Sequence, residues 1–176
     1  PSTLMDATGQ PFLGSPDMVR PGTYAVIFNE SGEVLLEKRA DFGLWGLPGG
    51  AVDAGESVET GAIREVLEET GLRVSIKRLV GIYSDPGHYT IAVYPNGTSV
   101  HYVSLLFECE GLGGELRISS ESTDIGYFDP LELPEDVMIA HQIRISDALA
   151  DRPTPFSCSM VSAPSMASTT FARSIR

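Results

Sequence analysis

The sequence predicts an α+β fold in which a mixed β-sheet is flanked by helices. Two observations predict it. Runs rich in β-branched and aromatic residues are interrupted by two segments of helical period, and 176 residues suffice for one domain with a core. Hydrophobic residues make up 42% and charged residues 20%, which is typical of globular proteins.

The first part of the chain predicts a lead-in followed by a hairpin. Residues 1–20 carry Pro, Gly and Ser without a period and predict an irregular segment. Residues 23–29 and 33–39 are β-rich, and the Glu-Ser-Gly between them indicates a hairpin. Residues 43–50, GLWGLPGG, predict a loop or a short strand dense in breakers.

Residues 57–70 predict the first helix. Ser57 is a favourable N-cap, Glu59 adds negative charge to the first turn, and Gly71 provides the stop. At ~100° per residue the apolar positions share one face, which we expect to be buried. They are Ala62, Ile63, Val66, Leu67 and Thr70.

The second half predicts more strands and a last helix. A strand is expected over 73–84 and a hairpin over 90–108 around Pro-Asn-Gly. Residues 111–115 predict a turn, 124–129 a short strand, and 137–149 a helix with apolar residues at helical spacing.

Composition bounds the organisation and the partners. We expect one domain over residues 21–150, followed by a flexible low-complexity tail over 151–176. The two cysteines, Cys109 and Cys158, form no disulfide framework, so a reducing cytoplasm is expected, with Cys109 buried. No apolar run is long enough for a membrane span, and a net charge of −12 disfavours nucleic acid as a partner.

Three glutamates share one strip of the first helix. Glu65, Glu68 and Glu69 are spaced three and four residues apart, so their like charges repel, and Arg64 is the single nearby cation. The strip is either a solvated acidic face or a set of hard oxygen ligands for Mg²⁺ or Mn²⁺. An acidic protein that acts on phosphorylated molecules needs such a cation.

The surrounding residues decide between these interpretations. Gly50, five residues, Glu56, seven residues and then Arg-Glu-Val-Leu-Glu-Glu-Thr-Gly-Leu over 64–72 resemble the Nudix box, Gly-x5-Glu-x7-Arg-Glu-U-x-Glu-Glu-x-Gly-U, at every specified position. Gly61 stands where alanine is usual in this family. More loosely, the resemblance extends from Pro21 to Leu149 and implies the Nudix α/β/α sandwich.

The resemblance also implies an activity and residue roles. Glu65 and Glu69 would be the principal ligands of Mg²⁺, for which Mn²⁺ can substitute, with the Gly49 carbonyl as a further ligand. Glu68 would be a third ligand or would hold a water beside the metal. The two remaining polar residues of the box, Arg64 and Glu56, would orient the ligands, although Arg64 could instead bind a phosphate.

The catalytic base and the substrate are left open at this stage. Glu68 and the loop residue Glu121 are the candidates for taking the proton. The resemblance implies cleavage of a phosphoanhydride bond in a nucleoside diphosphate linked to another group, and bacterial ADP-ribose pyrophosphatase-like members are similar, so ADP-ribose or an ADP-sugar is favoured. The alternatives are a (d)NTP or dinucleoside polyphosphate hydrolase and a non-catalytic nucleotide sensor. A homodimer is a further expectation.

Several other residues have weaker predictions. His88 and Tyr89 are expected to lie near the substrate pocket, between the loops 85–89 and 111–124. His141 is expected to be a surface or packing residue, and Tyr94 and Tyr102 to pack in the core rather than stack on a base.

Overall fold

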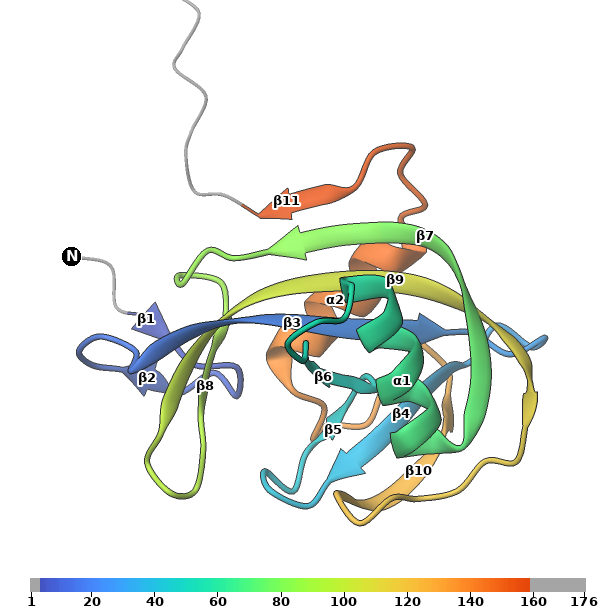
Figure 1. The fold of residues 1–176 in the computed structure, drawn as a ribbon, viewed down its shortest axis with the longest axis horizontal. Helices are drawn as coiled ribbons and strands as arrows, with labels where there is room; N and C mark the ends of the chain where they lie inside the picture. Colours follow the sequence, from blue (N-terminus) through green and yellow to red (C-terminus); the bar gives the residue numbers. More distant parts are fainter. Residues whose placement is uncertain (1–3, 159–176) are drawn as a thin grey trace, which may run out of the picture.

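The computed structural model describes residues 4–158 (Figure 1). Within them a mixed sheet of six strands runs in the order β11-β7-β9-β3-β6, and β8 pairs with β9. The pairs β3–β9 and β7–β11 are parallel, and the other pairs are antiparallel. The strands are β3 (Met18–Ile27), β6 (Gly49–Ala51), β7 (Leu72–Tyr83), β8 (Ile91–Val93), β9 (Ser99–Gly114) and β11 (Phe156–Cys158).

A second, antiparallel sheet lies beside the first. Its strand order is β10-β4-β5, from β4 (Val34–Arg39), β5 (Trp45–Gly46) and β10 (Ser122–Phe128). A small pair, β1 (Leu4–Met5) and β2 (Pro11–Phe12), precedes β3.

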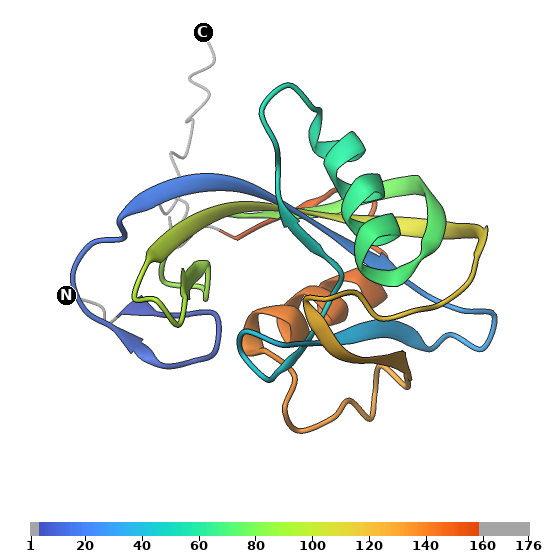
Figure 2. The same cartoon turned by 60° about the horizontal axis from the view of Figure 1, so that its bottom comes forward.

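Two helices cover the strands from opposite sides. Figure 2 shows the long strands β3 and β9 passing between α1 (Val58–Thr70) and α2 (Ile139–Leu149). A mixed sheet between two helices confirms the predicted α/β/α sandwich.

Alternation along two strands builds two cores. On β3, Ala25 and Ile27 pack with α1, whereas Val26 faces the opposite core with Ile145 of α2. On β4, Leu35 joins the α1 core, whereas Val34 and Leu36 join the α2 core. Both strands are therefore buried on two faces, which fixes the position of α1 relative to β4. Cys109 is buried in the α1 core, as expected.

The prediction that residues 23–29 and 33–39 pair with each other as a hairpin is wrong. The turn exists, because Asn29 N–H donates to the Glu33 carbonyl at 2.9 Å. The two strands share one isolated bridge, Phe28 with Val34, and then diverge into different sheets. The partners of β3 come instead from β9 and β6, far along the chain.

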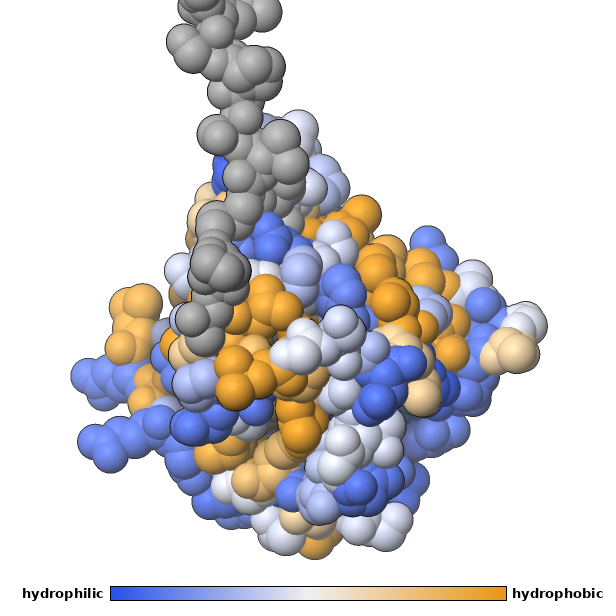
Figure 3. All heavy atoms as spheres, turned by 90° about the vertical axis from the view of Figure 1, so that its left-hand side faces the viewer, coloured by the Kyte–Doolittle hydropathy of each residue, from blue (hydrophilic) through white to orange (hydrophobic). Residues whose placement is uncertain are grey.

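The predicted irregular lead-in is largely ordered. Residues 4–12 form the β1–β2 pair, and β3 already begins at Met18. Ala7 N–H donates to the Ile91 carbonyl at 2.7 Å, so this segment lies against β8. Figure 3 shows this end of the molecule, where hydrophobic and hydrophilic residues are interspersed.

Two other predictions change near the ends of strands. Residues 111–114, expected as a turn, continue β9 and pair with the start of β7. Gly114 is required there, because a Cβ would lie 2.4 Å from the Gly71 carbonyl oxygen. The tail predicted over 151–176 contains β11, which pairs with β7 at the edge of the sheet, and residues 159–176 lie outside the described residues. No helix in the described range is long and apolar enough to span a membrane.

Candidate active site

Helix α1 carries most of the candidate residues and begins and ends as predicted. The Ser57 Oγ accepts a hydrogen bond from Thr60 N at 3.1 Å, and Gly71 ends the helix at φ 76°. The buried face is narrower than expected, because Ile63 and Leu67 are 37% and 43% exposed. It consists of Gly61, Ala62, Val66, Glu69 and Thr70.

Gly61 explains how closely this helix approaches its neighbours. A Cβ at residue 61 would lie 3.0 Å from a Glu56 carboxylate oxygen and 3.3 Å from the Thr23 methyl group. The glycine at this box position therefore has a packing reason despite its lower helix propensity.

Glu69 lies in the interior, whereas the sequence placed it on a surface strip. Its side chain faces β4 and β6, and the residue is 4% exposed. The Gly49 N–H donates to its Oε2 at 2.7 Å. Burial, followed by the nearby Glu37 carboxyl, raises the pKa of Glu69 to about 10. In this environment the charged form of the Glu69 carboxyl is unfavourable, and a bound cation would stabilise it.

Glu65 and the two glycines of β6 meet at the helix surface. A Cβ on Gly50 would lie 2.9 Å from Glu65 Oε1, so the carboxylate rests against bare backbone. Gly49 has φ 144°, and a Cβ there would lie 2.2 Å from the Thr23 carbonyl oxygen. Only glycine fits at this position. Burial raises the pKa of Glu65, opposed by its hydrogen bond with Arg64.

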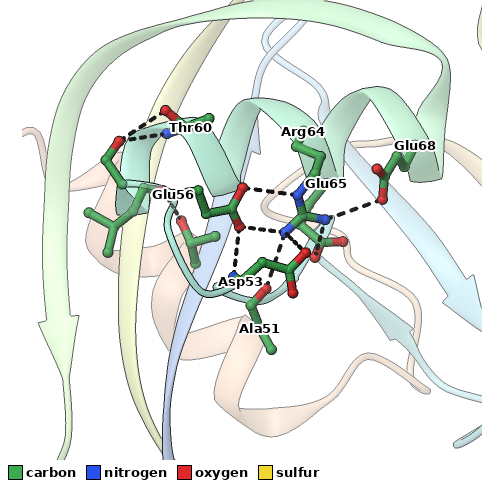
Figure 4. Close-up of polar contacts among 10 residues, drawn as sticks. Ala51, Asp53, Glu56, Thr60, Arg64, Glu65 and Glu68 are labelled. Atoms are coloured by element: carbon green, nitrogen blue, oxygen red, sulfur yellow. Dashed lines mark hydrogen bonds and ion pairs between the residues drawn. The ribbon is translucent and has the colours of Figure 1, made fainter.

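Arg64 gathers the carboxylates of the box (Figure 4). It binds Glu56 through two hydrogen bonds of 2.6 and 3.1 Å, Glu65 at 2.9 Å and Glu68 at 3.2 Å. Asp53 lies 3.6 Å away. The Arg64 hydrogen bonds, with a further one from Asp53 N–H, lower the pKa of Glu56 to about 2. The guanidinium thus fixes the position of Glu65 and Glu68 from one side.

The two candidate bases both reach the cavity described below, from different elements. The Glu68 side chain is 60% exposed at the outer end of the strip. Glu121 is exposed in the loop before β10, and its carbonyl accepts a hydrogen bond from Ala40 N at 2.8 Å. This bond ties the loop to the end of β4.

A second buried glutamate, Glu37, was missed by the sequence analysis. It lies on β4 at 1% exposure, accepts a short hydrogen bond from the Ser122 hydroxyl and shares a side-chain hydrogen bond with Glu69. Burial is the largest cause that raises its pKa. A signal was available, because Glu37 directly follows the apolar run Val-Leu-Leu, and a charged residue there is unusual if the strand is buried on both faces.

A cavity of about 500 Å³ opens beside these residues. Glu65, Glu68, Glu69 and Glu121 line one part of it. The remaining wall carries aromatic rings and arginines: Tyr24, Phe42, Tyr89, Tyr94, Tyr102, Arg20, Arg39, Arg64 and Arg144. Positive charge and planar rings therefore face the carboxylates within one pocket.

The predicted pocket loops contribute less than expected. Tyr89 and Glu121 line the cavity, whereas His88 is outside its lining. Arg20, from the segment predicted as a lead-in, belongs to it. Tyr102 is buried in a small core cluster with Tyr94 packed against it, as expected, and both also line this wall, with their hydroxyls 2.7 Å apart. His141 is buried as a packing residue and also reaches the cavity.

The donor set fits a hard divalent cation. Carboxylate and carbonyl oxygens are the ligands that Mg²⁺ and Mn²⁺ prefer. Among the described residues no three side chains already converge as a metal cluster. The contacts explain this, because Arg64 engages Glu65 and Glu68, while the Gly49 N–H engages Glu69.

Comparison with known proteins identifies the family. The family model described as NUDIX domain matches residues 18–149. The chain therefore belongs to the NUDIX family and is a Nudix hydrolase. Nudix hydrolases generally use divalent metal ions, in agreement with the carboxylate strip.

Individual relatives carry different names. The chain is 38% identical over 135 residues to a MutT-like protein of Streptomyces ambofaciens, covering 77% of this chain and 80% of that protein. It is 37% identical to an ADP-ribose pyrophosphatase of Methanocaldococcus jannaschii, over 62% of each chain. The crystal structure of an ADP-ribose pyrophosphatase from Streptococcus suis superimposes with a TM-score of 0.58 at 27% identity, covering 78% of this chain and 96% of that one.

Proposed function

We propose that the protein hydrolyses a phosphoanhydride bond in a small nucleotide with Mg²⁺, for which Mn²⁺ can substitute. The substrate is a nucleoside diphosphate linked to a second group, with ADP-ribose or an ADP-sugar as the first candidate. One observation carries this proposal. Glu65, Glu68, Glu69 and Glu121 line the same cavity as four arginines and several aromatic rings.

The chain's own residues would hold the cation and the substrate. Glu65, Glu69 and the Gly49 carbonyl are the proposed ligands, with Glu68 completing the set. When bound, the cation supplies charge neutralisation at the attacked phosphorus and lowers the pKa of the attacking water. Arg64 keeps Glu65 and Glu68 oriented and limits their mutual repulsion, and Glu56 fixes Arg64.

Glu121 is the proposed acceptor of the proton. It reaches the cavity from the loop before β10, whereas Glu65, Glu68 and Glu69 reach it from α1. Glu68 is the weaker candidate, because its Oε2 is already engaged as the acceptor of a hydrogen bond from Arg64 at 3.2 Å. A net charge of −12 over the whole chain disfavours a long polyanion as the substrate.

Nucleoside triphosphates are the second candidate substrates. The chain is 48% identical over 69 residues to a putative 8-oxo-dGTP diphosphatase of Bacillus subtilis, covering 46% of that protein. Because that stretch is short, nucleoside triphosphates are included in the substrate panel and are not the first candidate. A homodimer and a cytoplasmic location stay predictions.

A substrate panel tests the proposal. Purified enzyme with Mg²⁺ is offered ADP-ribose, an ADP-sugar, dNTPs and diadenosine polyphosphates, and products are separated by chromatography. The expected result is the highest kcat/KM for a nucleoside diphosphate derivative. A hundredfold preference for a triphosphate would refute the first candidate, and no turnover of any nucleotide would refute the proposed function.

A further inference from the structure

Two polar side chains of α2 form the floor of the cavity. His141 and Arg144 lie one turn apart and are 3% and 4% exposed, yet both belong to the cavity lining. Gly46 of β5 makes room for the imidazole, because a Cβ there would lie 3.0 Å from its Nδ1. This pair has no part in the proposed metal chemistry.

The hydrogen bonds of His141 determine its tautomer. The Leu47 N–H donates to Nδ1 at 2.7 Å, so Nδ1 is the unprotonated nitrogen. Burial, followed by the positive charge of Arg144, lowers the pKa of His141 well below its usual value, so the ring is neutral. A neutral ring whose Nδ1 is unprotonated carries its proton on Nε2.

That proton faces a second donor. The Arg144 Nη1 lies 3.3 Å from His141 Nε2, and a guanidinium has donors only. The opposite tautomer would place N–H against N–H at Leu47 instead. In either tautomer, one N–H group around the imidazole has no acceptor among these residues. An oxygen that accepts hydrogen bonds from both His141 and Arg144 would provide it.

The guanidinium of Arg144 also has no carboxylate as an ion-pair partner among the described residues. Its guanidinium lies 4.6 Å from the Tyr24 ring centroid and 5.2 Å from that of Tyr83, with a side-chain hydrogen bond to Tyr24. No ion pair joins it to any carboxylate in the described part of the chain. Two of the other three arginines in the lining differ, since Arg39 is paired with Asp41 at 2.8 Å and Arg64 with four carboxylates; the third, Arg20, is exposed.

We propose that His141 and Arg144 form a substrate-recognition site that binds an oxygen without a hydrogen, on the part of the nucleotide away from the cleaved bond. The two donors favour a carbonyl or an anionic oxygen over an amino group, because an N–H₂ there would meet two further donors. This inference rests on the proposed function and defines the base or the linked group that the enzyme prefers.

Two sources can provide such an oxygen. A nucleobase with a carbonyl in place of an amino group would enter between the rings of the same cavity, where Phe42, Tyr94 and Tyr102 offer planar surfaces. A carboxylate on the linked sugar would instead pair with Arg144 as a charge-assisted contact. Both require the same two donors.

Matched substrate pairs test the site. The first pair is IDP-ribose and ADP-ribose, which differ in the carbonyl or amino group at one ring position. The second pair is UDP-glucuronate and UDP-glucose, which differ in a carboxylate or a hydroxymethyl group. The kcat/KM ratio is measured for each pair with Mg²⁺, and binding of each nucleotide is measured by calorimetry without the metal.

Three variants accompany the wild type. Arg144→Met removes the charge, and Arg144→Lys keeps the charge but loses the planar fork, which preserves the test if Arg144→Met does not fold. Arg78→Met is the matched control. Its guanidinium donates to the Ala148 carbonyl at 2.9 Å, so it anchors α2 from outside the cavity without lining it.

The expected result is a preference of about tenfold or more for the oxygen-bearing member of one pair, in kcat/KM and in binding. Both Arg144 variants should reduce that preference to within about twofold by raising KM, with kcat retained, whereas Arg78→Met keeps it. Preference in the first pair assigns the oxygen to the base, and in the second pair to the linked group. Turnover without discrimination in either pair, or loss of the preference in Arg78→Met, overturns this inference alone. Absence of turnover with every nucleotide overturns the proposed function instead.

Discussion

Replacing Glu69 with glutamine is expected to lower kcat by about 10³-fold and to stabilise the metal-free protein at neutral pH. Glu69 is 4% exposed and accepts a hydrogen bond from Gly49 N–H at 2.7 Å. A glutamine side chain has the same shape, its carbonyl can accept that bond, and its amide can donate to Glu37. The substitution therefore removes the charge of a proposed metal ligand without leaving a cavity.

The expected gain in stability follows from the shifted pKa. Burial and Glu37 raise the pKa of Glu69 from 4.5 to about 10, so the folded state disfavours the charged carboxylate. The resulting cost is absent below pH 4.5, grows as the pH rises, and is complete above the folded pKa. At pH 7, about 2.5 pH units above the unfolded pKa, it is on the order of 3 kcal/mol, which Glu69→Gln would recover.

Chemical denaturation in EDTA at pH 4.5 and pH 7, together with turnover in Mg²⁺, measures both effects. We expect equal unfolding free energies at pH 4.5, a more stable variant at pH 7, and a loss in kcat on the order of 10³-fold. Glu59→Gln is the matched control, because it lies exposed on the same helix and should leave turnover unchanged. A Glu69→Gln variant that keeps its turnover would refute the ligand assignment, and one that is less stable than wild type at pH 7 would refute the burial reasoning.

Three further outcomes are expected. Arg64→Ala should reduce kcat/KM by about 10–100-fold, measured by steady-state kinetics, because Glu65 and Glu68 lose their common partner; Arg64→Ala kinetics equal to wild type would contradict this. Gly49→Ala should lower the melting temperature sharply in a thermal scan, since its Cβ would lie 2.2 Å from a carbonyl oxygen, whereas Gly97→Ala, with nothing within 4 Å, should lower it far less. Glu56 has a pKa lowered to about 2, so its contribution to stability is present above about pH 4.5 and is lost as the pH falls toward 2. Thermal unfolding of Glu56→Gln should accordingly show a deficit at pH 7 that disappears near pH 2, and a deficit independent of pH would refute that cause.

The chemistry of α1 was predictable because its signals are local. Ser57, Gly71 and the spacing of the glutamates define the helix and the residues that share its strip. The depth of Glu69 was not predictable, because helical spacing indicates a face and not what lies against it. Glu37 and Gly49 bury that carboxyl, and both come from strands whose pairing depends on distant residues.

The sheet pairing shows the same limit. The turn at residues 30–32 was correct, yet its flanking strands separate after one bridge, because β3 pairs with β9 over ten positions of register instead. Local turn chemistry favours a hairpin, whereas burial of both faces of β3 and β4 decides the partners. His141 and Arg144 were invisible as a site for a related reason, since only the packing of α2 under the cavity brings their donors together.

Dependence of turnover on the divalent cation tests the central claim most directly. The enzyme is treated with excess EDTA, dialysed, and titrated with Mg²⁺ while nucleotide hydrolysis is followed, and Mn²⁺ binding is measured by calorimetry on the same preparations. If Glu65, Glu68 and Glu69 hold the catalytic cation, turnover is absent in EDTA and returns with Mg²⁺. Mn²⁺ binding is then weakened in Glu69→Gln and unchanged in Glu59→Gln. Full turnover in excess EDTA would contradict the account.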